Sequence, residues 1–266
     1  MAFYYDYHAD APDAFLLKQH ENLGFKAHFH AAMEIYFVLT GRMQAEISGK
    51  LYDIDAGEMF VVNPFEIHSY IRTENTLVNV LIIGNEYLSD FKAEYGNQFP
   101  QTHLTNKPYN ADILATLKGI PFSFYNNTTL SNLAKKGHSN LVLAKIADGY
   151  GLVTPSVSQE QVIKIMRFIY ENYSQKITLE TLAEEFNYTK TSISRLLSKH
   201  LRMDLRSFVN NLRAEQAELL LNDPKNAKLS VLHIASLCGF DSPATFYRAY
   251  KRRYNRHPRK FDGTLL

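Results

Sequence analysis

The sequence predicts an α+β protein, with an N-terminal β-barrel and following helices, then an all-α C-terminal domain with two helix-turn-helix units. Three observations lead to this prediction. Short runs of β-branched and aromatic residues fill residues 27–83. After about residue 111 the apolar residues recur with a helical period. Near the C-terminus one helical pattern occurs twice, 53 residues apart.

The N-terminal strands are indicated by six short runs: EIYFVLTG, MQAEISG, LYDIDAG, EMFVVNP, EIHSYIR and TLVNVLIIG. Their β-branched and aromatic residues favour an extended backbone. Glycines and a proline separate them, namely Gly41, Gly49, Gly57, Pro64 and Gly84. Short strands at spacings of about ten residues are typical of an antiparallel sandwich or a small barrel.

Helices are expected after these strands. NADILATLKGI and NLVLAKIADGY have helical spacing, although Gly119 and Pro121 interrupt the first. The stretch DGYGLVTPSVS contains Gly, Pro and Ser and is typical of a linker. The predicted domains are therefore residues 1–148 and residues 159–266, with a linker at 149–158.

Residues 159–266 have helical patterns to the end. In QEQVIKIMRFIYENY one helix face carries Val162, Ile165, Met166, Ile169 and Tyr170. Further helices are expected in LETLAEEF, TKTSISRLLSKHL, DLRSFVNNLRAEQAELLLND, SVLHIASLC and PATFYRAYKRRY.

The net charge of +2 hides an asymmetry between the two parts. Residues 1–157 hold 11 Lys and Arg against 16 Asp and Glu, whereas residues 158–266 hold 18 against 11. An acidic front and a basic back indicate that only the C-terminal part meets a polyanion.

The repeated pattern has the features of a helix-turn-helix. Two helices that cross at a wide angle need a small residue where they touch, which Ala183 and Ala235 supply. The turn needs a residue that tolerates positive φ, which Asn187 and Gly239 supply. Each second helix then begins after a hydroxyl N-cap candidate, Thr189 or Ser242.

The second helix of such a unit lies in the DNA major groove. Arg195 and Arg248 take equivalent places in the two copies, and each can bind a guanine edge in bidentate fashion. Five further basic residues are placed to meet phosphates: Lys190, Lys199, Lys251, Arg252 and Arg256. The connector 204–222 is about 28 Å long as a helix. It can hold two reading helices about one DNA turn, roughly 34 Å, apart.

The aromatic residues among these arginines have mostly another role. Phe246, Tyr250 and Tyr254 recur at helical spacing and are expected in the core. Only Tyr247 is expected on the groove side, beside Arg248.

Three motifs carry a family resemblance: ITLETLAEEF, NLRAEQAELLL and IASLCGFDSPATFYRAYKRRYNRHPRKF. Together, about the last hundred residues resemble the DNA-binding domain of the AraC/XylS family of bacterial transcription regulators. The resemblance implies that the residues facing bases are Thr191, Ser194, Arg195, Ala244, Tyr247 and Arg248. Arg202 and Asn255 stand where the family usually has glycine, and Asp262 replaces a usual arginine.

The N-terminal part holds a spaced set of residues: His28, His30, Glu34, Gly41, Gly57, Pro64 and His68. The set resembles the two cupin motifs, as they occur in the sensor domain of AraC-type regulators. Because side chains alternate along a strand, His28 and His30 point to one face. Glu34 and His68 complete the ligand set of a metal-dependent cupin, which suits Fe, Mn or Zn.

The prediction nevertheless favours a site without metal or other cofactor. The family's sensor domains often keep these histidines without a metal, and Phe65 replaces a usual turn glycine. A polar patch inside an apolar barrel suits a small hydroxylated ligand. The predicted ligand-binding residues are His28, His30, Glu34, Tyr36, His68 and Tyr70. The resemblance implies a carbohydrate, and satisfied core polar residues without a ligand are the alternative.

Other features limit the function classes. Cys238 is the only cysteine, which rules out an intrachain disulfide and suits the reducing cytoplasm. No signal peptide, membrane span, phosphate loop or nucleophile motif is found in the sequence. We therefore expect no enzymatic activity, and Cys238 is expected to serve packing.

The sequence thus predicts a cytoplasmic, homodimeric regulator that binds promoter DNA and responds to a small molecule. The helical stretch after residue 111 is the expected dimer contact, on family analogy and on its apolar face. Two alternatives remain open. One is a metal-dependent cupin enzyme fused to a DNA-binding domain, and the other is a constitutive DNA-binding dimer without an effector.

Overall fold

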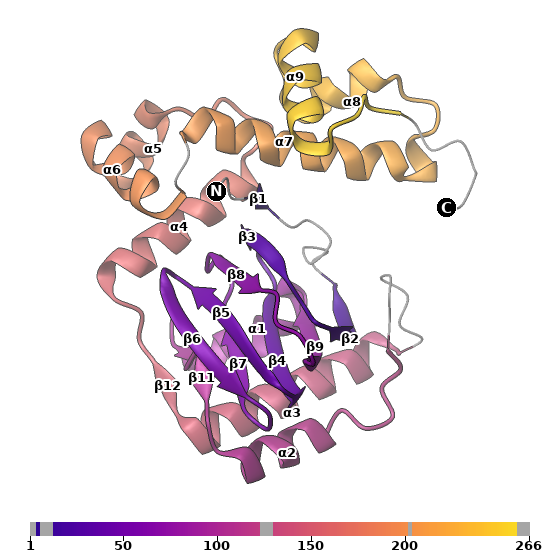
Figure 1. The fold of residues 1–266 in the computed structure, drawn as a ribbon. Coiled ribbons are helices and arrows are strands. Elements are labelled where there is room, and N and C mark those ends of the chain that lie inside the picture. Colours follow the sequence, from indigo (N-terminus) through magenta and orange to yellow (C-terminus); the bar gives the residue numbers. More distant parts are fainter. Residues whose placement is uncertain (1–3, 6–12, 123–129, 202–203, 260–266) are drawn as a thin grey trace. The chain divides into compact units, whose positions relative to one another are not determined.

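The computed structural model describes residues 4–5, 13–122, 130–201 and 204–259. The described residues form two compact units that divide between Ile163 and Lys164 (Figure 1). The first unit contains most of the strands, and the second contains the helices from residue 164 onward together with β1 (Tyr4–Tyr5).

The strands of the first unit form two main sheets and one short pair. Their bounds are β2 (Phe15–Glu21), β3 (Phe25–Phe29), β4 (Met33–Thr40), β5 (Arg42–Ile47), β6 (Lys50–Asp55), β7 (Met59–Val62), β8 (His68–Ile71), β9 (Leu77–Ile83), β10 (Phe99–Pro100), β11 (His103–Leu104) and β12 (Leu152–Val153). One sheet has the neighbours β3-β8-β5-β6, and the other has the order β11-β7-β4-β9-β2. All pairings in these two runs are antiparallel.

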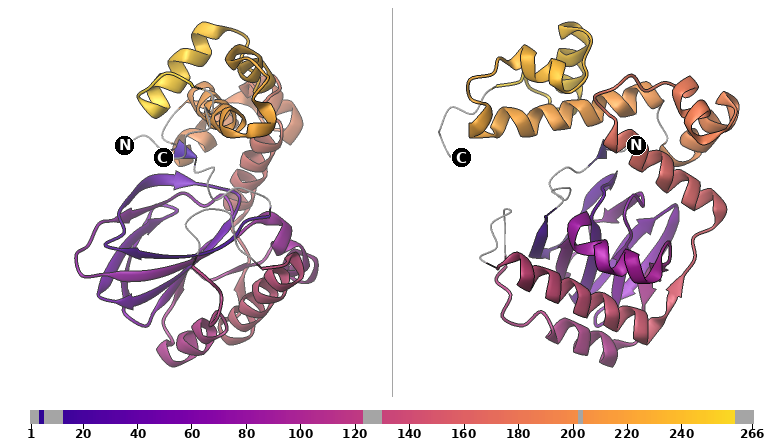
Figure 2. Two further views of the ribbon diagram at one scale, coloured as in Figure 1. Left: turned by 90° about the vertical axis from the view of Figure 1, so that its right-hand side faces the viewer. Right: turned by 180° about the vertical axis from the view of Figure 1, so that it is seen from behind.

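The two sheets enclose one apolar core. A second apolar core lies between the β11-β7-β4-β9-β2 sheet and the helices that cover its other face. Alternation along β4 sends Tyr36 and Val38 toward the core between the sheets, and Ile35 and Phe37 toward the helices. These helices are α1 (Ser89–Tyr95), α2 (Lys107–Ala115) and α3 (Asn132–Tyr150), after the 3-10 turn η2 (Asn85–Leu88). Figure 2 shows α3 lying across the sheet. Its N-terminus is capped by Ser131, whose side chain accepts from the Ala134 amide.

The predicted strands are confirmed as β4 to β9, and the predicted helices after them as α2 and α3. β2 lies before the predicted strand region, and it pairs along its whole length with β9. The stretch predicted as a linker contains the end of α3, the strand β12 and the start of α4 (Val157–Glu171). The domain boundaries at 148 and 159 stay a prediction.

The second unit is helical, as the sequence predicts. After α4 come α5 (Leu179–Phe186), α6 (Lys190–Leu201), α7 (Leu205–Asn222), the 3-10 turn η3 (Pro224–Asn226), α8 (Val231–Leu237) and α9 (Pro243–Tyr254). The apolar face predicted for α4 is confirmed, because Ile165, Met166 and Ile169 are buried. α7 packs against both α8 and α9, and Ala214, Ala217 and Leu221 of α7 lie in the shared core.

Helix starts in this unit are set by short polar side chains. Thr178 and Thr181 form a reciprocal capping box at α5. Asp204 accepts from the Ser207 amide at 2.8 Å at the start of α7. None of the helices in the described part of the chain combines the length and the apolar character that a bilayer crossing requires.

Candidate nucleic-acid interface and candidate metal centre

Both predicted helix-turn-helix units are present. In the first, α5 is capped by Asn187, whose φ of 55° is left-handed, and Ala183 of α5 is buried. In the second, α8 is followed by Gly239 with φ 86°, and Ala235 is buried. The small residues and the positive φ values therefore occur where the turn requires them.

The hydroxyl N-caps of the second helices are also confirmed. Thr189 Oγ1 accepts from the Ser192 amide at 3.1 Å before α6. Ser242 Oγ accepts from the Thr245 amide at 3.3 Å before α9. These bonds satisfy backbone donors that the first helical turn leaves without an intrahelical partner.

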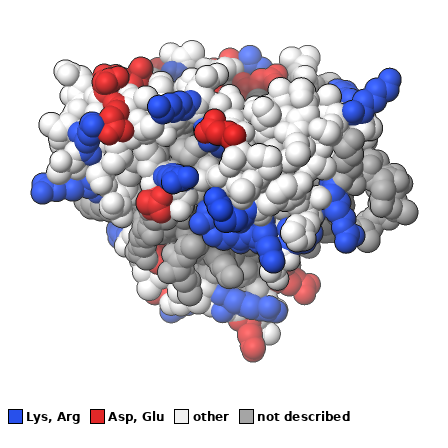
Figure 3. Space-filling view, turned by 90° about the horizontal axis from the view of Figure 1, so that it is seen from above, with Lys and Arg blue, Asp and Glu red and all other residues white. Residues whose placement is uncertain are grey.

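Each second helix has one buried and one exposed face. Ile193 and Leu197 of α6 are buried, as are Phe246 and Tyr250 of α9. The opposite faces carry the predicted DNA-binding residues. Those exposed are Lys190, Thr191, Arg195, Ala244, Tyr247, Arg248 and Arg252, and Ser194 is half-buried. Figure 3 shows several Lys and Arg side chains grouped near the middle of the face seen from above.

Some predicted basic contacts have acidic partners. The Lys190 ammonium lies 2.6 Å from Glu180 Oε1. This hydrogen bond from Lys190, with bonds from the Glu180 amide and Thr178, lowers the pKa of Glu180 to about 2. Arg256, which the sequence grouped with the phosphate contacts, pairs with Glu218 of α7.

Sequence reasoning missed the acidic residues of α7 that receive these arginines. Glu215 and Glu218 are both buried, and Arg253 pairs with Glu215 as Arg256 pairs with Glu218. The sequence did contain a signal for a buried acidic partner. Arg253 follows Phe246 by seven residues, so it lies on the same, buried face of the helix. Asn255 takes the left-handed conformation with φ 54°. Arg202, Asp262 and the Lys199 side chain lie outside what the structure describes.

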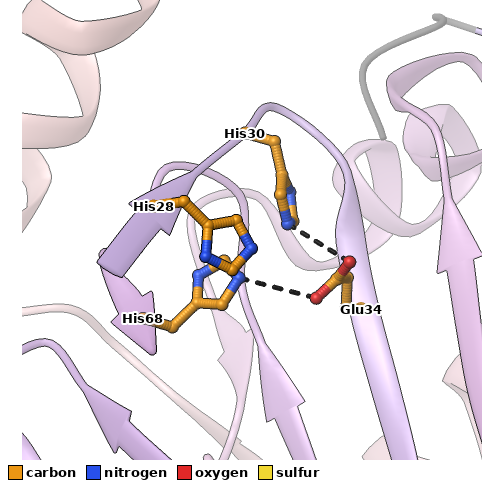
Figure 4. Close-up of side chains that lie close together, drawn as sticks. All are labelled: His28, His30, Glu34 and His68. Atoms are coloured by element: carbon orange, nitrogen blue, oxygen red, sulfur yellow. Dashed lines mark ion pairs between the residues drawn. The ribbon is translucent and has the colours of Figure 1, made fainter. Parts of the chain in front are cut away.

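The histidines predicted for the N-terminal site do come together. His28, His30, Glu34 and His68 are all buried, and one potential ligand atom from each lies within 4.8 Å of the others (Figure 4). His28 lies near the end of β3, beside β8, where its register partner is His68. His30 Nε2 lies 3.3 Å from Glu34 Oε1, and His68 Nε2 lies 3.5 Å from Glu34 Oε2.

Tyr36 and Tyr70, the other predicted ligand-binding residues, bind the same carboxylate. Their hydroxyls donate to Glu34 Oε2 over 2.6 Å and 3.1 Å. Burial alone would raise the pKa of Glu34, but His30 and His68 outweigh burial and hold it well below its usual value. Burial and Glu34 both raise the pKa of Tyr70 well above its usual value. The site therefore contains an ionised carboxylate inside an apolar barrel.

The histidine nitrogens show what the carboxylate faces. His30 Nδ1 lies 3.0 Å from the Ala32 carbonyl oxygen, and His68 Nδ1 lies 2.8 Å from the Glu66 carbonyl oxygen. Since a carbonyl only accepts, each Nδ1 carries the proton, and burial lowers the pKa of His68 toward the neutral form. A protonated ring donates from Nε2 to Glu34, and this charge and hydrogen bond lower the pKa of Glu34. A neutral ring instead leaves its Nε2 lone pair facing the carboxylate, which is itself an acceptor.

Such anchoring of Nδ1 by a carbonyl is typical of histidines that bind a metal through Nε2. Three imidazoles and one carboxylate suit Mn, Fe or Zn. The residues at this site therefore fit a divalent transition metal. Phe65, beside the site, has φ 65°, and its amide donates to the His30 carbonyl. It thus takes the glycine-like conformation of the residue that the cupin motif usually has there.

Cys238 has the packing role that the sequence predicts. It is buried among the apolar residues of α7, α8 and α9, and burial raises its pKa to about 12. A thiol with so high a pKa is a poor nucleophile.

Both parts of the chain are similar in sequence to known proteins. The model of a helix-turn-helix domain matches residues 182–263, and that of a cupin domain matches residues 16–84. The Msm operon regulatory protein of Streptococcus mutans is 22% identical over 239 residues, covering 85% of this chain and 82% of the relative. The HTH-type transcriptional activator RhaS of Mannheimia succiniciproducens is 25% identical over 247 residues, covering 89% and 88%.

Solved structures show the same fold over nearly the whole chain. A crystal structure of ToxT from Vibrio cholerae with a bound unsaturated fatty acid has a TM-score of 0.54 at 16% identity. It covers 92% of this chain and 93% of ToxT. Together, the helix-turn-helix match, the cupin match and these relatives confirm the resemblance of the chain to DNA-binding transcription regulators of the AraC/XylS family.

Proposed function

We propose that this regulator reads promoter DNA with α6 and α9 and that its cupin domain binds a small-molecule effector. One observation carries the first part. Each unit presents an exposed arginine, Arg195 or Arg248, on the face opposite its buried apolar residues. An exposed guanidinium on the second helix of such a unit suits a bidentate bond to guanine.

The other exposed residues divide by chemistry. Thr191, Ser194, Ala244 and Tyr247 offer hydroxyl and apolar groups to base edges. Lys190 offers an ammonium group and Arg252 a guanidinium group to DNA phosphates. Such phosphate contacts fix the register of the protein on the duplex.

Selection of duplexes from a random pool tests the DNA-reading role. Arg248→Ala should cost about 1–3 kcal/mol on the selected DNA and relax the preference at one base pair. Arg252→Ala, a matched loss on the same helix, should weaken binding equally on all sequences. An Arg248→Ala variant that binds like wild type, or that loses affinity equally on every duplex, contradicts the assignment.

The proposed effector is a small molecule that bears hydroxyl groups, with carbohydrate as the first class to test. The support is a buried cluster of imidazole, carboxylate and phenol groups inside the barrel: His28, His30, Glu34, Tyr36, His68 and Tyr70. ToxT, which shares the fold, was solved with a fatty acid, so fatty acids form the second class to test. Repeating the selection with and without a metabolite library, beside thermal-shift assays, tests for an effector. If no compound shifts the melting temperature or the selected DNA, the protein is a constitutive DNA binder.

A second candidate is a metal-loaded cupin domain, and the Nδ1 bonds of His30 and His68 favour it. The metal would neutralise the Glu34 carboxylate and occupy the Nε2 lone pairs. Metal analysis of protein purified without chelators tests this candidate. Stoichiometric Mn, Fe or Zn that is lost in His30→Ala supports it, and metal-free protein that still melts cooperatively contradicts it.

We also propose a homodimer formed through the helices after residue 111. α3 exposes Leu133 and Leu141, which suits a contact with a second copy. Sedimentation of wild type and of Leu133→Glu with Leu141→Glu tests the contact. A mass that does not change between the two contradicts it.

A further inference from the structure

The basic residues of α9 serve two different surfaces. Three of them are exposed: Arg248, Lys251 and Arg252. Arg253 instead follows Phe246 and Tyr250 on the buried face, and its Nε donates to Glu215 Oε1 over 2.7 Å. The Glu215 side chain is fully buried, so Arg253 compensates a charge inside the unit.

Glu218 of α7 receives more donors. Arg256 Nη2 and the Tyr250 hydroxyl both donate to its carboxylate, and Asn222 Nδ2 adds a bond of 3.0 Å. The Arg256 guanidinium also lies 5.6 Å from the ring centroids of both Tyr250 and Tyr254. Asn255 caps the C-terminus of α9 in the left-handed conformation. Arg256 follows this turn, and its guanidinium lies against the tyrosine rings of α9.

Each glutamate depends on its partner. A buried carboxylate that loses its cation is left as an uncompensated charge, which is strongly destabilising. α7 is the helix that connects the two helix-turn-helix units. Arg253 lies in the last turn of α9 and Arg256 follows its C-cap, so the two ion pairs hold the C-terminal end of α9 against α7. The direction in which α9 presents Arg248 is therefore tied to Glu215 and Glu218.

We propose that Arg253 and Arg256 are positioning residues for the second reading helix, held by Glu215 and Glu218, and that they do not bind DNA phosphate. The inference rests on the proposed use of α9 to read DNA. Of the five basic residues between 248 and 256, only Arg248, Lys251 and Arg252 then contribute to the charge that DNA meets.

The salt dependence of binding separates the two roles, because each phosphate contact adds about 0.9 to the slope of log K against log salt. The full-length protein is titrated with its selected duplex at several salt concentrations. The decisive variant is Glu218→Gln with Arg256→Gln, in which no buried charge is left without its partner. Its slope should equal that of wild type, whereas the matched Arg252→Gln should lower the slope by about 0.9. A double variant whose slope falls as in Arg252→Gln overturns the proposal.

Base preference separates positioning from a purely structural role. Arg256→Gln alone, assayed well below its melting temperature, should lose about tenfold in the ratio of specific to non-specific affinity, with partial recovery when Glu218→Gln is added. A substitution at Glu218 could not restore a lost phosphate contact. Unchanged preference in folded Arg256→Gln overturns the positioning role. A wild-type protein without any sequence preference would overturn the proposed function as well, which distinguishes the two failures.

Discussion

Gly239, in the turn of the second helix-turn-helix, lies directly on the backbone of Ser174, between α4 and α5. A Cβ atom at Gly239 would lie 2.5 Å from the Ser174 carbonyl oxygen. Arg213 of α7 holds the same segment, because its Nε and Nη2 each donate over 2.7 Å, to the carbonyl oxygens of Tyr173 and Gln175. The turn of the second helix-turn-helix is thus packed against the segment that leads into the first helix-turn-helix.

Gly239→Ala should destabilise the protein by at least about 2 kcal/mol. The left-handed conformation alone costs an L-residue roughly 1–2 kcal/mol, and the methyl group would meet backbone that cannot rotate away. Urea unfolding measures the change. The matched control is Gly137→Ala in α3, where the added Cβ meets nothing within 4 Å. This control should gain about 0.5–1 kcal/mol. Equal changes in both variants would contradict the argument.

Asn187→Ala should cost about 1 kcal/mol, because Asn187 ends α5 with φ 55°. Asn187→Gly keeps the left-handed turn available and should be close to neutral. Thermal or urea unfolding of the pair checks the prediction. If the alanine variant is as stable as the glycine variant, the turn does not need a left-handed residue.

Local patterns predicted much of the architecture. The helix-turn-helix turns follow from two kinds of local signal, small residues and left-handed residues, and both are confirmed in the structure. The six predicted strands are bounded by Gly and Pro, and the structure has them as β4 to β9. β2 was not predicted, because FLLKQHE lacks β-branched residues and its first three residues are all buried. α1 has seven residues with only Phe91 buried, which is too short to show a period.

The contacts that complete the sites join distant residues. Glu215 and Arg253 are 38 residues apart, and Tyr70 and Glu34 are 36 apart. A sequence pattern shows which face a residue occupies but not which helix or strand lies opposite. The histidine positions could therefore be predicted, whereas the convergence of two tyrosines on one oxygen of Glu34 required the structure.

Glu180→Gln should change both the acid sensitivity and the DNA affinity of the first unit. The folded-state pKa of Glu180 is about 2, below its usual 4.5, so its contribution to stability is present above about pH 4.5 and lost as the pH falls toward 2. The glutamine variant lacks this part of the acid dependence. At neutral pH it also releases Lys190 and should bind DNA more tightly at low salt.

Acid unfolding curves and low-salt DNA titrations of Glu180→Gln measure the two effects. Glu184→Gln, an exposed loss of one negative charge on the same helix, is the control. An equal gain in DNA affinity for both variants would assign the effect to net charge and not to Lys190.

Tyr36 and Tyr70 should show strong coupling through Glu34. Both hydroxyls donate to Oε2 of this buried carboxylate, so Tyr36→Phe or Tyr70→Phe alone leaves one donor in place. Each single variant should cost about 1.5–3 kcal/mol, the usual range for a hydrogen bond to a charged group. Losing both leaves a buried charge with less compensation, so the double variant should cost more than the sum by at least about 0.5 kcal/mol.

Urea unfolding with a chelator present measures the cycle without any metal contribution. Tyr52→Phe on β6, half-buried, should change stability by less than about 0.5 kcal/mol. Strictly additive losses would mean that the two tyrosines stabilise the barrel through packing and not through the Glu34 carboxylate.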